Sequence, residues 1–131
     1  MNSLFVYGTL LNDEIMSELI GRTVKNSSAT LFDYKCFAVA DQSYPAIRPS
    51  QGSKVAGLLL TGLSNQEMQA LDDYEGDQYR LELVTVKTIS NHIEPCWAYV
   101  FKPEYYHQLS RSSWSNDEFR SDQLRAFIAQ S

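Results

Sequence analysis

Four acidic residues lie close together in one short stretch of the chain: Asp72, Asp73, Glu75 and Asp77. Carboxylates this dense can bind a divalent metal ion, transfer protons, or form the solvated end of a helix. A calcium loop of the EF-hand type is excluded, because its oxygen ligands alternate along the loop and end in a bidentate glutamate at the twelfth position. A metal-dependent hydrolase, an acid/base residue and a surface feature therefore remain open as interpretations.

Glu75 is the member of this group best suited to exchange a proton. It falls at the predicted C-terminal end of a helix, where the helix dipole disfavours negative charge. The neighbouring acids repel a further negative charge, and Tyr74 and Tyr79 are close enough in sequence to shield it from water. Each effect favours the protonated carboxyl and raises its pKa towards neutrality, where a general acid/base works best. Arg80 would oppose this shift if it paired with Glu75, and the sequence leaves both outcomes open.

A second segment of interest is the turn Tyr7-Gly8-Thr9-Leu10, which follows a short apolar strand and precedes a helix. Gly8 permits a tight bend and a close approach of a ligand to the backbone. The free N–H groups at the start of the following helix favour an anion such as a carboxylate. A Walker-type phosphate site is not indicated, because no Walker lysine follows. An ordinary strand-to-helix turn is the alternative interpretation.

The elements that carry these segments have clear start and stop signals. One helix is predicted after Asn12, with an apolar face that ends before Gly21. A second helix begins at Ser64, which forms an S-x-x-E capping box with Glu67, and ends near Glu75. We expect Glu75 to be placed by the end of this second helix.

Strand-forming stretches recur between the helices and cover residues 4–7, 29–32, 37–40, 55–61, 79–89 and 95–101. The last two predict an antiparallel hairpin. Pro45 and Pro49 argue against a paired central strand in residues 44–49, and a turn is expected at 50–54. A closing helix is predicted in residues 115–128. This mixture favours an α+β fold with a mixed, mostly antiparallel, barrel-like sheet.

Length and charge restrict the class of protein. The 131 residues suit a single domain, residues 1–131, and the net charge of -5 argues against nucleic acid or an anionic membrane as partner. Cys36 and Cys96 are interpreted as buried thiols, since no metal-binding spacing surrounds them. A strand-like run begins almost at the first residue and no long apolar stretch follows, so we expect a soluble, cytoplasmic protein.

In their order along the chain, these segments resemble the γ-glutamylcyclotransferase-like (AIG2-like) family. The residues that carry the resemblance are Phe5 to Leu10, Tyr44-Pro45-Ala46, the strand with Gly57, Leu71-Asp72 through Tyr74-Glu75-Gly76, Tyr79-Arg80, and Trp114 with Phe119. The ordered combination is more specific than any one of its parts.

The resemblance implies a small β-barrel flanked by helices, with a substrate pocket between the glycine turn and the acidic helix end. It implies cyclisation of the γ-glutamyl group of a small substrate to 5-oxoproline, with release of an amine or amino acid and without a metal or other cofactor. Glu75 would be the catalytic acid/base. The substrate would contact Tyr7, Gly8, Thr9, Leu10 and Tyr79. A non-catalytic binding module of the same fold is the alternative, and the leaving group and oligomeric state stay open.

Overall fold

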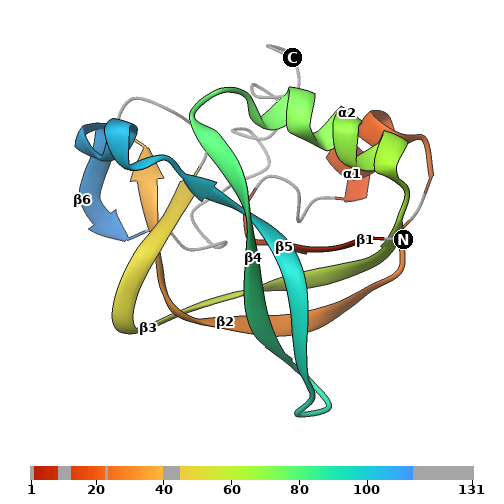
Figure 1. Cartoon of the computed structure of the whole chain (residues 1–131), viewed down its shortest axis with the longest axis horizontal. Coiled ribbons are helices and arrows are strands. Elements are labelled where there is room, and N and C mark those ends of the chain that lie inside the picture. Colours follow the sequence, from red (N-terminus) through yellow and green to blue (C-terminus); the bar gives the residue numbers. More distant parts are fainter. Residues whose placement is uncertain (1, 9–12, 23, 40–44, 114–131) are drawn as a thin grey trace.

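The computed structural model describes residues 2–8, 13–22, 24–39 and 45–113. Its elements in chain order are β1 (Asn2–Val6), α1 (Asp13–Ile20), β2 (Asn26–Val39), β3 (Pro45–Leu63), α2 (Asn65–Glu75), β4 (Tyr79–Thr88), β5 (Ile93–Phe101), the 3-10 helix η2 (Pro103–Gln108) and β6 (Leu109–Ser113). Figure 1 shows α1 and α2 together on one side of the strands, while the β4–β5 hairpin extends away from them.

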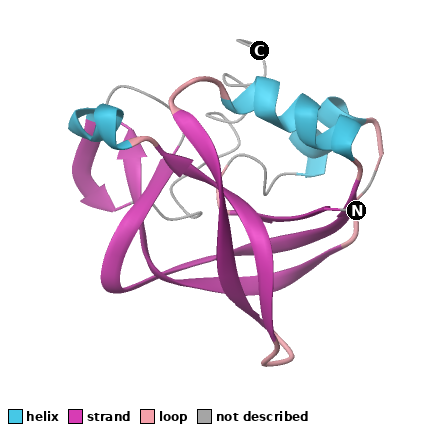
Figure 2. Ribbon diagram, in the orientation of Figure 1, coloured by secondary structure: helices cyan, strands magenta, loops and turns pink. Residues whose placement is uncertain are grey.

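The strands form a closed barrel. The sheet order is β3-β1-β5-β4-β2-β6. An additional pairing between β3 and β2 closes the five strands from β1 through β5 into a ring. Strand β1 is parallel to β5, whereas every other pairing is antiparallel. The predicted mixed, mostly antiparallel barrel flanked by helices is therefore confirmed (Figure 2).

Side chains that point alternately to the two faces of the strands form two hydrophobic clusters. One cluster takes buried residues from all five barrel strands, including Phe5 and Leu59, and fills the barrel. The other includes Leu4 and Leu60, each next in sequence to a member of the first cluster, together with Leu71 of α2 and residues of α1. Successive strand residues point to opposite faces, so the same strands line the barrel interior and support the helices outside it.

Strands β2 and β3 are longer than the sequence predicts. The stretches 29–32 and 37–40 belong to the same strand as far as residue 39, and the pairing register shifts between Phe32 and Tyr34. Here Asp33 has φ 65° and Gly52 of β3 has φ 84°. The Gly52 N–H donates a hydrogen bond of 3.0 Å to Asp33 Oδ1. The expected turn at 50–54 is wrong, because this bulge bends both strands without reversing either one.

The prolines of β3 lie in a paired strand, but not in a central one. Pro45 lies opposite Ala38, and Pro49 lies opposite Tyr34. Within the described residues, this part of β3 pairs only with β2, and a strand with one open edge tolerates proline. The start of β3 is therefore fixed in the sheet.

The capping signals of α2 are confirmed. Ser64 Oγ accepts a hydrogen bond from the Glu67 N–H at 3.1 Å, and Glu67 Oε1 accepts one from the Ser64 N–H at 2.9 Å. Arg22 holds the same glutamate from the end of α1, with 2.6 Å between Nε and Oε2. The helix ends at Glu75, and Gly76 follows with φ 84°. Both ends of α2 are thus fixed where the sequence places them.

The remaining helix and hairpin predictions are confirmed where the structure describes the residues. Helix α1 ends before Gly21, which has φ 77°, and β4 and β5 form the expected antiparallel hairpin. The proposed N-cap Asn12 and the closing helix at 115–128 lie outside the described residues. No helix in the described ranges is long and apolar enough to cross a membrane.

Candidate active site

Glu75 is the last residue of α2 and is partly buried. Its carboxyl has a pKa raised to about 8, mainly because burial disfavours the charged form and secondly because the charge of Asp72 lies nearby. A group with this pKa is mostly protonated at neutral pH, yet it loses its proton readily. The residue at position 75 is therefore suited to act as both acid and base.

Arg80 does not neutralise Glu75. Its Nη2 lies 2.6 Å from Glu82 Oε1, so its charge is paired within β4. In the part of the chain that the structure describes, no salt bridge or hydrogen bond reaches the Glu75 carboxyl. The repulsion from the acidic neighbour is therefore not cancelled by a cation in contact.

Tyr7 brings the other predicted segment to Glu75. The residue follows β1, is buried, and donates a 2.7 Å hydrogen bond from Oη to the Tyr99 carbonyl oxygen. Burial raises the Tyr7 pKa well above its usual value, and the charge of Glu75 raises it further. A hydrogen bond from the Ile47 backbone acts in the opposite direction. The end of β1 and the end of α2, far apart in sequence, thus meet at one place.

Tyr99 also belongs to this meeting point. Its hydroxyl lies 3.5 Å from Asp72 Oδ1, and burial together with the charges of Asp72 and Glu75 raises its pKa. In the sequence it is one aromatic residue of a predicted strand. Nothing in the local pattern shows that β5 runs parallel to β1, so this neighbour of the site was not predicted.

Tyr79 connects two strands through its hydroxyl group. Its hydroxyl donates a 2.8 Å hydrogen bond to the Pro45 carbonyl oxygen, and its ring packs edge-on against Phe101 with 5.2 Å between centroids. Tyr79 is buried at the start of β4. It therefore ties β4 to the start of β3.

Gly8 packs against the same proline. A Cβ atom at position 8 would lie 2.6 Å from Pro45 Cγ and 2.9 Å from Cδ, closer than such carbon atoms approach one another. A side chain at position 8 can therefore be accommodated only if the Pro45 ring moves. Thr9 and Leu10, the other predicted substrate-binding residues of the turn, lie outside the described residues.

Gly8→Ala is expected to destabilise the fold by about 1–3 kcal/mol, because a rigid proline ring must move to admit the methyl group. Urea unfolding measures the change. The double variant Gly8→Ala/Pro45→Ala removes the ring that is hit, so its loss should be smaller than the sum of the two single losses. Strict additivity of the two losses would contradict this contact.

The sequence is similar to proteins of a known family over most of its length. The sequence pattern of the family described as Gamma-glutamyl cyclotransferase, AIG2-like matches residues 4–117. AIG2-like protein D of Arabidopsis thaliana is 31% identical over 134 residues, which cover 98% of this chain and 85% of that protein. The chain belongs to the γ-glutamyl cyclotransferase, AIG2-like family. A Methanocaldococcus jannaschii protein whose name includes gamma-glutamylcyclotransferase is 32% identical over 73 residues, 56% of this chain and 33% of that protein.

Solved structures agree with the fold of an AIG2-like protein. A solution structure from Arabidopsis thaliana superposes with a TM-score of 0.75 at 26% identity, covering 98% of this chain and 78% of the other. A structure named gamma-glutamyl cyclotransferase gives a TM-score of 0.72 at 18% identity and covers 99% of both chains. At this low identity the second structure supports the fold alone.

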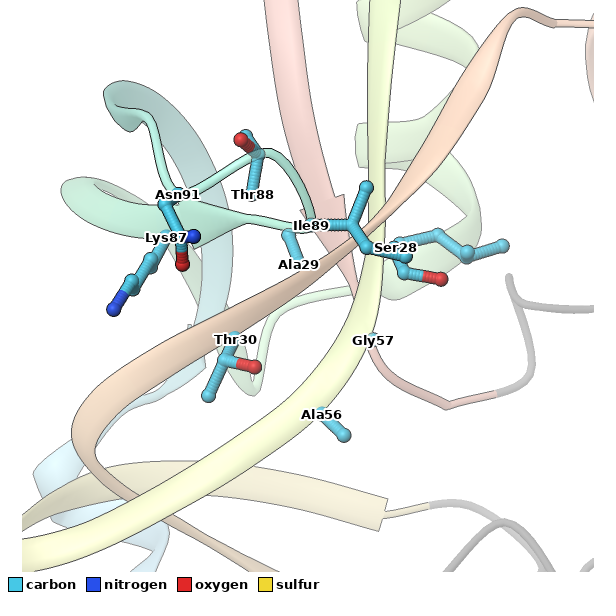
Figure 3. A pocket seen from close by; sticks show the side chains of 10 residues that line it. Ser28, Ala29, Thr30, Ala56, Gly57, Lys87, Thr88, Ile89 and Asn91 are labelled. Atoms are coloured by element: carbon cyan, nitrogen blue, oxygen red, sulfur yellow. The ribbon is translucent and has the colours of Figure 1, made fainter.

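Two pockets of this AIG2-like chain lie away from Glu75. One, of about 450 Å³, lies between β2, β3 and the end of β4, and Figure 3 shows Thr30, Ala56, Gly57 and Lys87 around it. The other, of about 640 Å³, lies beside Arg22 and Glu67. Neither is lined by Glu75, Tyr7, Gly8 or Tyr79, so neither is assigned to the candidate site.

Within the described residues, the carboxylates of the acidic stretch are not grouped as metal ligands. Among the described residues, which include Asp72, Asp73, Glu75 and Asp77, no group of three or more His, Cys, Asp or Glu side chains is placed to hold a metal ion. The metal-dependent hydrolase therefore finds no support in the arrangement of these four carboxylates.

Glu75→Gln is expected to stabilise the protein at pH 8 but not at pH 4. The folded protein holds a proton on Glu75 up to about pH 8, whereas the usual carboxyl value is 4.5. The wild-type free energy of unfolding should therefore fall as the pH rises through this window, since the unfolded chain releases the proton first. Glutamine cannot lose a proton, and its advantage at pH 8 should be about 2–4 kcal/mol.

Urea unfolding of both proteins at pH 4 and pH 8 measures this difference. Asp73→Asn is the control, because Asp73 is an exposed acid in the same helical turn. An equal gain for Glu75→Gln at both pH values would show that Glu75 has an ordinary pKa.

Proposed function

We propose that this protein is a cofactor-independent γ-glutamylcyclotransferase. It converts the γ-glutamyl group of a small γ-glutamyl amine or amino acid into 5-oxoproline and releases the amine. The observation that carries the proposal is the raised pKa of Glu75, about 8, at the point where α2 meets the Tyr7–Gly8 turn. Membership of a family named for this reaction supports it.

The turn would bind the acidic end of the substrate. The segment from Gly8 to Leu10 leads along the chain to α1, which begins at Asp13, and the free N–H groups of a helix start favour a carboxylate. The α-carboxylate of the γ-glutamyl group would bind there, which brings its α-ammonium group towards Glu75. Tyr7 and Tyr79 would help to position this turn, because their hydroxyl groups donate hydrogen bonds to the carbonyl oxygens of Tyr99 and Pro45, respectively.

Glu75 would move one proton in each direction. As carboxylate it takes a proton from the α-ammonium group, and the positive charge of that group stabilises the carboxylate form while the substrate is bound. The freed amine attacks the γ-carbonyl carbon, a C–N bond forms, and the five-membered ring closes. Glu75 then gives its proton to the departing nitrogen as the original amide C–N bond breaks. The ring nitrogen loses a second proton, which the released amine takes up, so the amine departs as an ammonium ion and Glu75 ends as it began.

The reaction is intramolecular, so most of its acceleration can come from holding the substrate folded. Aligned amine and carbonyl groups can lower the barrier by roughly 7–11 kcal/mol relative to separate reactants. Positioned proton transfer adds about 10²–10⁴-fold. These two contributions require no covalent intermediate.

Mass-spectrometric detection of 5-oxoproline tests the proposal. The purified protein is incubated with a panel of γ-glutamyl amino acids and γ-glutamyl amines, with and without a strong chelator. We expect turnover of at least one substrate that the chelator does not affect. Saturable binding of the panel without product would favour a non-catalytic binding module, and loss of turnover in chelator would favour a metal enzyme.

A further inference from the structure

Arg48 lies close to two aromatic rings. Its guanidinium carbon lies 5.2 Å from the ring centroid of Phe37 in β2 and 5.1 Å from that of Tyr106 in η2. Both distances lie within the roughly 6 Å range of cation–π contacts. A guanidinium group that stacks on aromatic faces can still donate its N–H groups to a partner.

Lys35 adds a second positive charge to the same ring. Its Nζ lies 5.3 Å from the Phe37 centroid, and Lys35 is the direct cross-strand neighbour of Arg48. Two like charges in directly opposite positions of an antiparallel pair are destabilising unless a counter-charge joins them. The sequence supplies 16 acids against 11 bases, so acidic partners are plentiful in this chain.

No acidic residue among the described residues supplies this counter-charge to Lys35 and Arg48. Within residues 2–8, 13–22, 24–39 and 45–113, neither Lys35 nor Arg48 has a salt bridge or a side-chain hydrogen bond. Glu82 lies 3.5 Å from the hydroxyl of Tyr34, the residue before Lys35, but it is paired with Arg80. The two cations therefore remain without a carboxylate in the described structure.

We propose that Arg48, supported by Lys35, is a binding site for a carboxylate. The guanidinium group of an arginine can present two parallel N–H donors, which match the two oxygens of a carboxylate. Lys35 supplies additional charge on the same face. The site lies between the start of β3 and η2, and it contains none of the residues assigned to the Glu75 site.

The carboxylate has two possible sources with the same chemistry. Two contacts connect this region to the Glu75 site. The backbone of Ile47, next to Arg48, forms a hydrogen bond with the Tyr7 hydroxyl. The 3-10 helix η2 is joined to the segment after Glu75 by a 2.8 Å hydrogen bond from Gln78 Nε2 to Gln108 Oε1. The α-carboxylate of a leaving amino acid is therefore one source, and this case rests on the proposed function. A separate small acid is the other source.

Titration with sodium succinate, at an ionic strength held constant with sodium chloride, tests the site by NMR. We expect saturable shifts of the Phe37 amide and the Tyr106 ring, and binding at least roughly tenfold weaker in Arg48→Met. Arg48→Lys keeps the charge without the planar fork and should bind with intermediate strength. Lys54→Met, an exposed lysine of the same strand, is the control and should bind like wild type. No saturable shift in wild type, or equal binding by Arg48→Met, would overturn the proposal.

A 5-oxoproline assay then separates the two sources. γ-Glutamylalanine and γ-glutamylethylamine differ by the carboxylate of the leaving group. If that carboxylate occupies the site, Arg48→Met should reduce the preference for the alanine substrate by roughly tenfold in kcat/KM. If a separate acid binds, the preference should stay unchanged while succinate binding is lost. If neither substrate yields 5-oxoproline, the result counts against the proposed function. The carboxylate-binding site is then still tested by the succinate titration alone.

Discussion

Glu75→Gln is expected to lower turnover of γ-glutamyl substrates by about 10²–10⁴-fold, because the side chain can no longer accept or return a proton. Glutamine keeps the size of the side chain and its polar atoms, so substrate should still bind. The measurement is 5-oxoproline release by mass spectrometry, with binding of the same substrate followed by calorimetry. A loss of kcat with retained binding identifies a proton-transfer residue.

Asp73→Asn provides the matched control for this loss. Asp73 is exposed, lies in the same turn of α2, and accepts a 3.1 Å hydrogen bond from Gln69. Its substitution removes one negative charge near Glu75 without touching the proposed chemistry. Turnover should therefore persist in Asp73→Asn. Equal losses in both variants would point to a general effect of charge at the helix end, and undiminished turnover in Glu75→Gln would remove this residue from the mechanism.

Gly57→Ala is expected to destabilise the barrel by about 3 kcal/mol or more, at the upper end of the range for overpacking. A Cβ atom at this position would lie 2.2 Å from the Val6 carbonyl oxygen and 2.8 Å from Phe5 Cζ. The first contact is with backbone, so side-chain rotation cannot relieve it. The end of β1 would have to move, and Tyr7 with it.

Gly62→Ala is the control for this prediction, because Gly62 lies in the same strand and a Cβ atom added there would meet nothing within 4 Å. Its φ of 76° makes alanine unfavourable by roughly 1–2 kcal/mol through backbone strain alone. Chemical unfolding should therefore rank wild type above Gly62→Ala and Gly62→Ala above Gly57→Ala. The reverse order of the two variants would contradict close packing of β1 on β3.

Local signals predicted the parts of the fold that depend on local physics. The capping box of Ser64 and Glu67 placed α2, and the glycine after Glu75 placed its end. Strand-forming residues in 79–89 and 95–101 predicted the hairpin. Because Glu75 is fixed by the end of a helix, the carboxylate with the raised pKa could be recognised in advance.

The errors came from interactions between distant segments. Gly52 was interpreted as a turn residue, but its hydrogen bond to Asp33 across the sheet converts the turn into a bulge. The involvement of Tyr99 depends on the parallel pairing of β5 with β1. The pairing of Arg80 with Glu82 is a choice between two nearby acids that residue types alone do not decide. Register and side-chain pairing across strands are set by tertiary contacts.

The proposed reaction depends on a Glu75 carboxyl that gains and loses a proton near neutral pH. A pH titration of its side-chain carboxyl carbon by ¹³C NMR in the substrate-free protein measures this directly, with the signal assigned by its absence from Glu75→Gln. We expect a midpoint near pH 8, as burial and the charge of Asp72 require. A midpoint close to the usual carboxyl value of 4.5 would contradict the assignment of Glu75 as the acid/base residue.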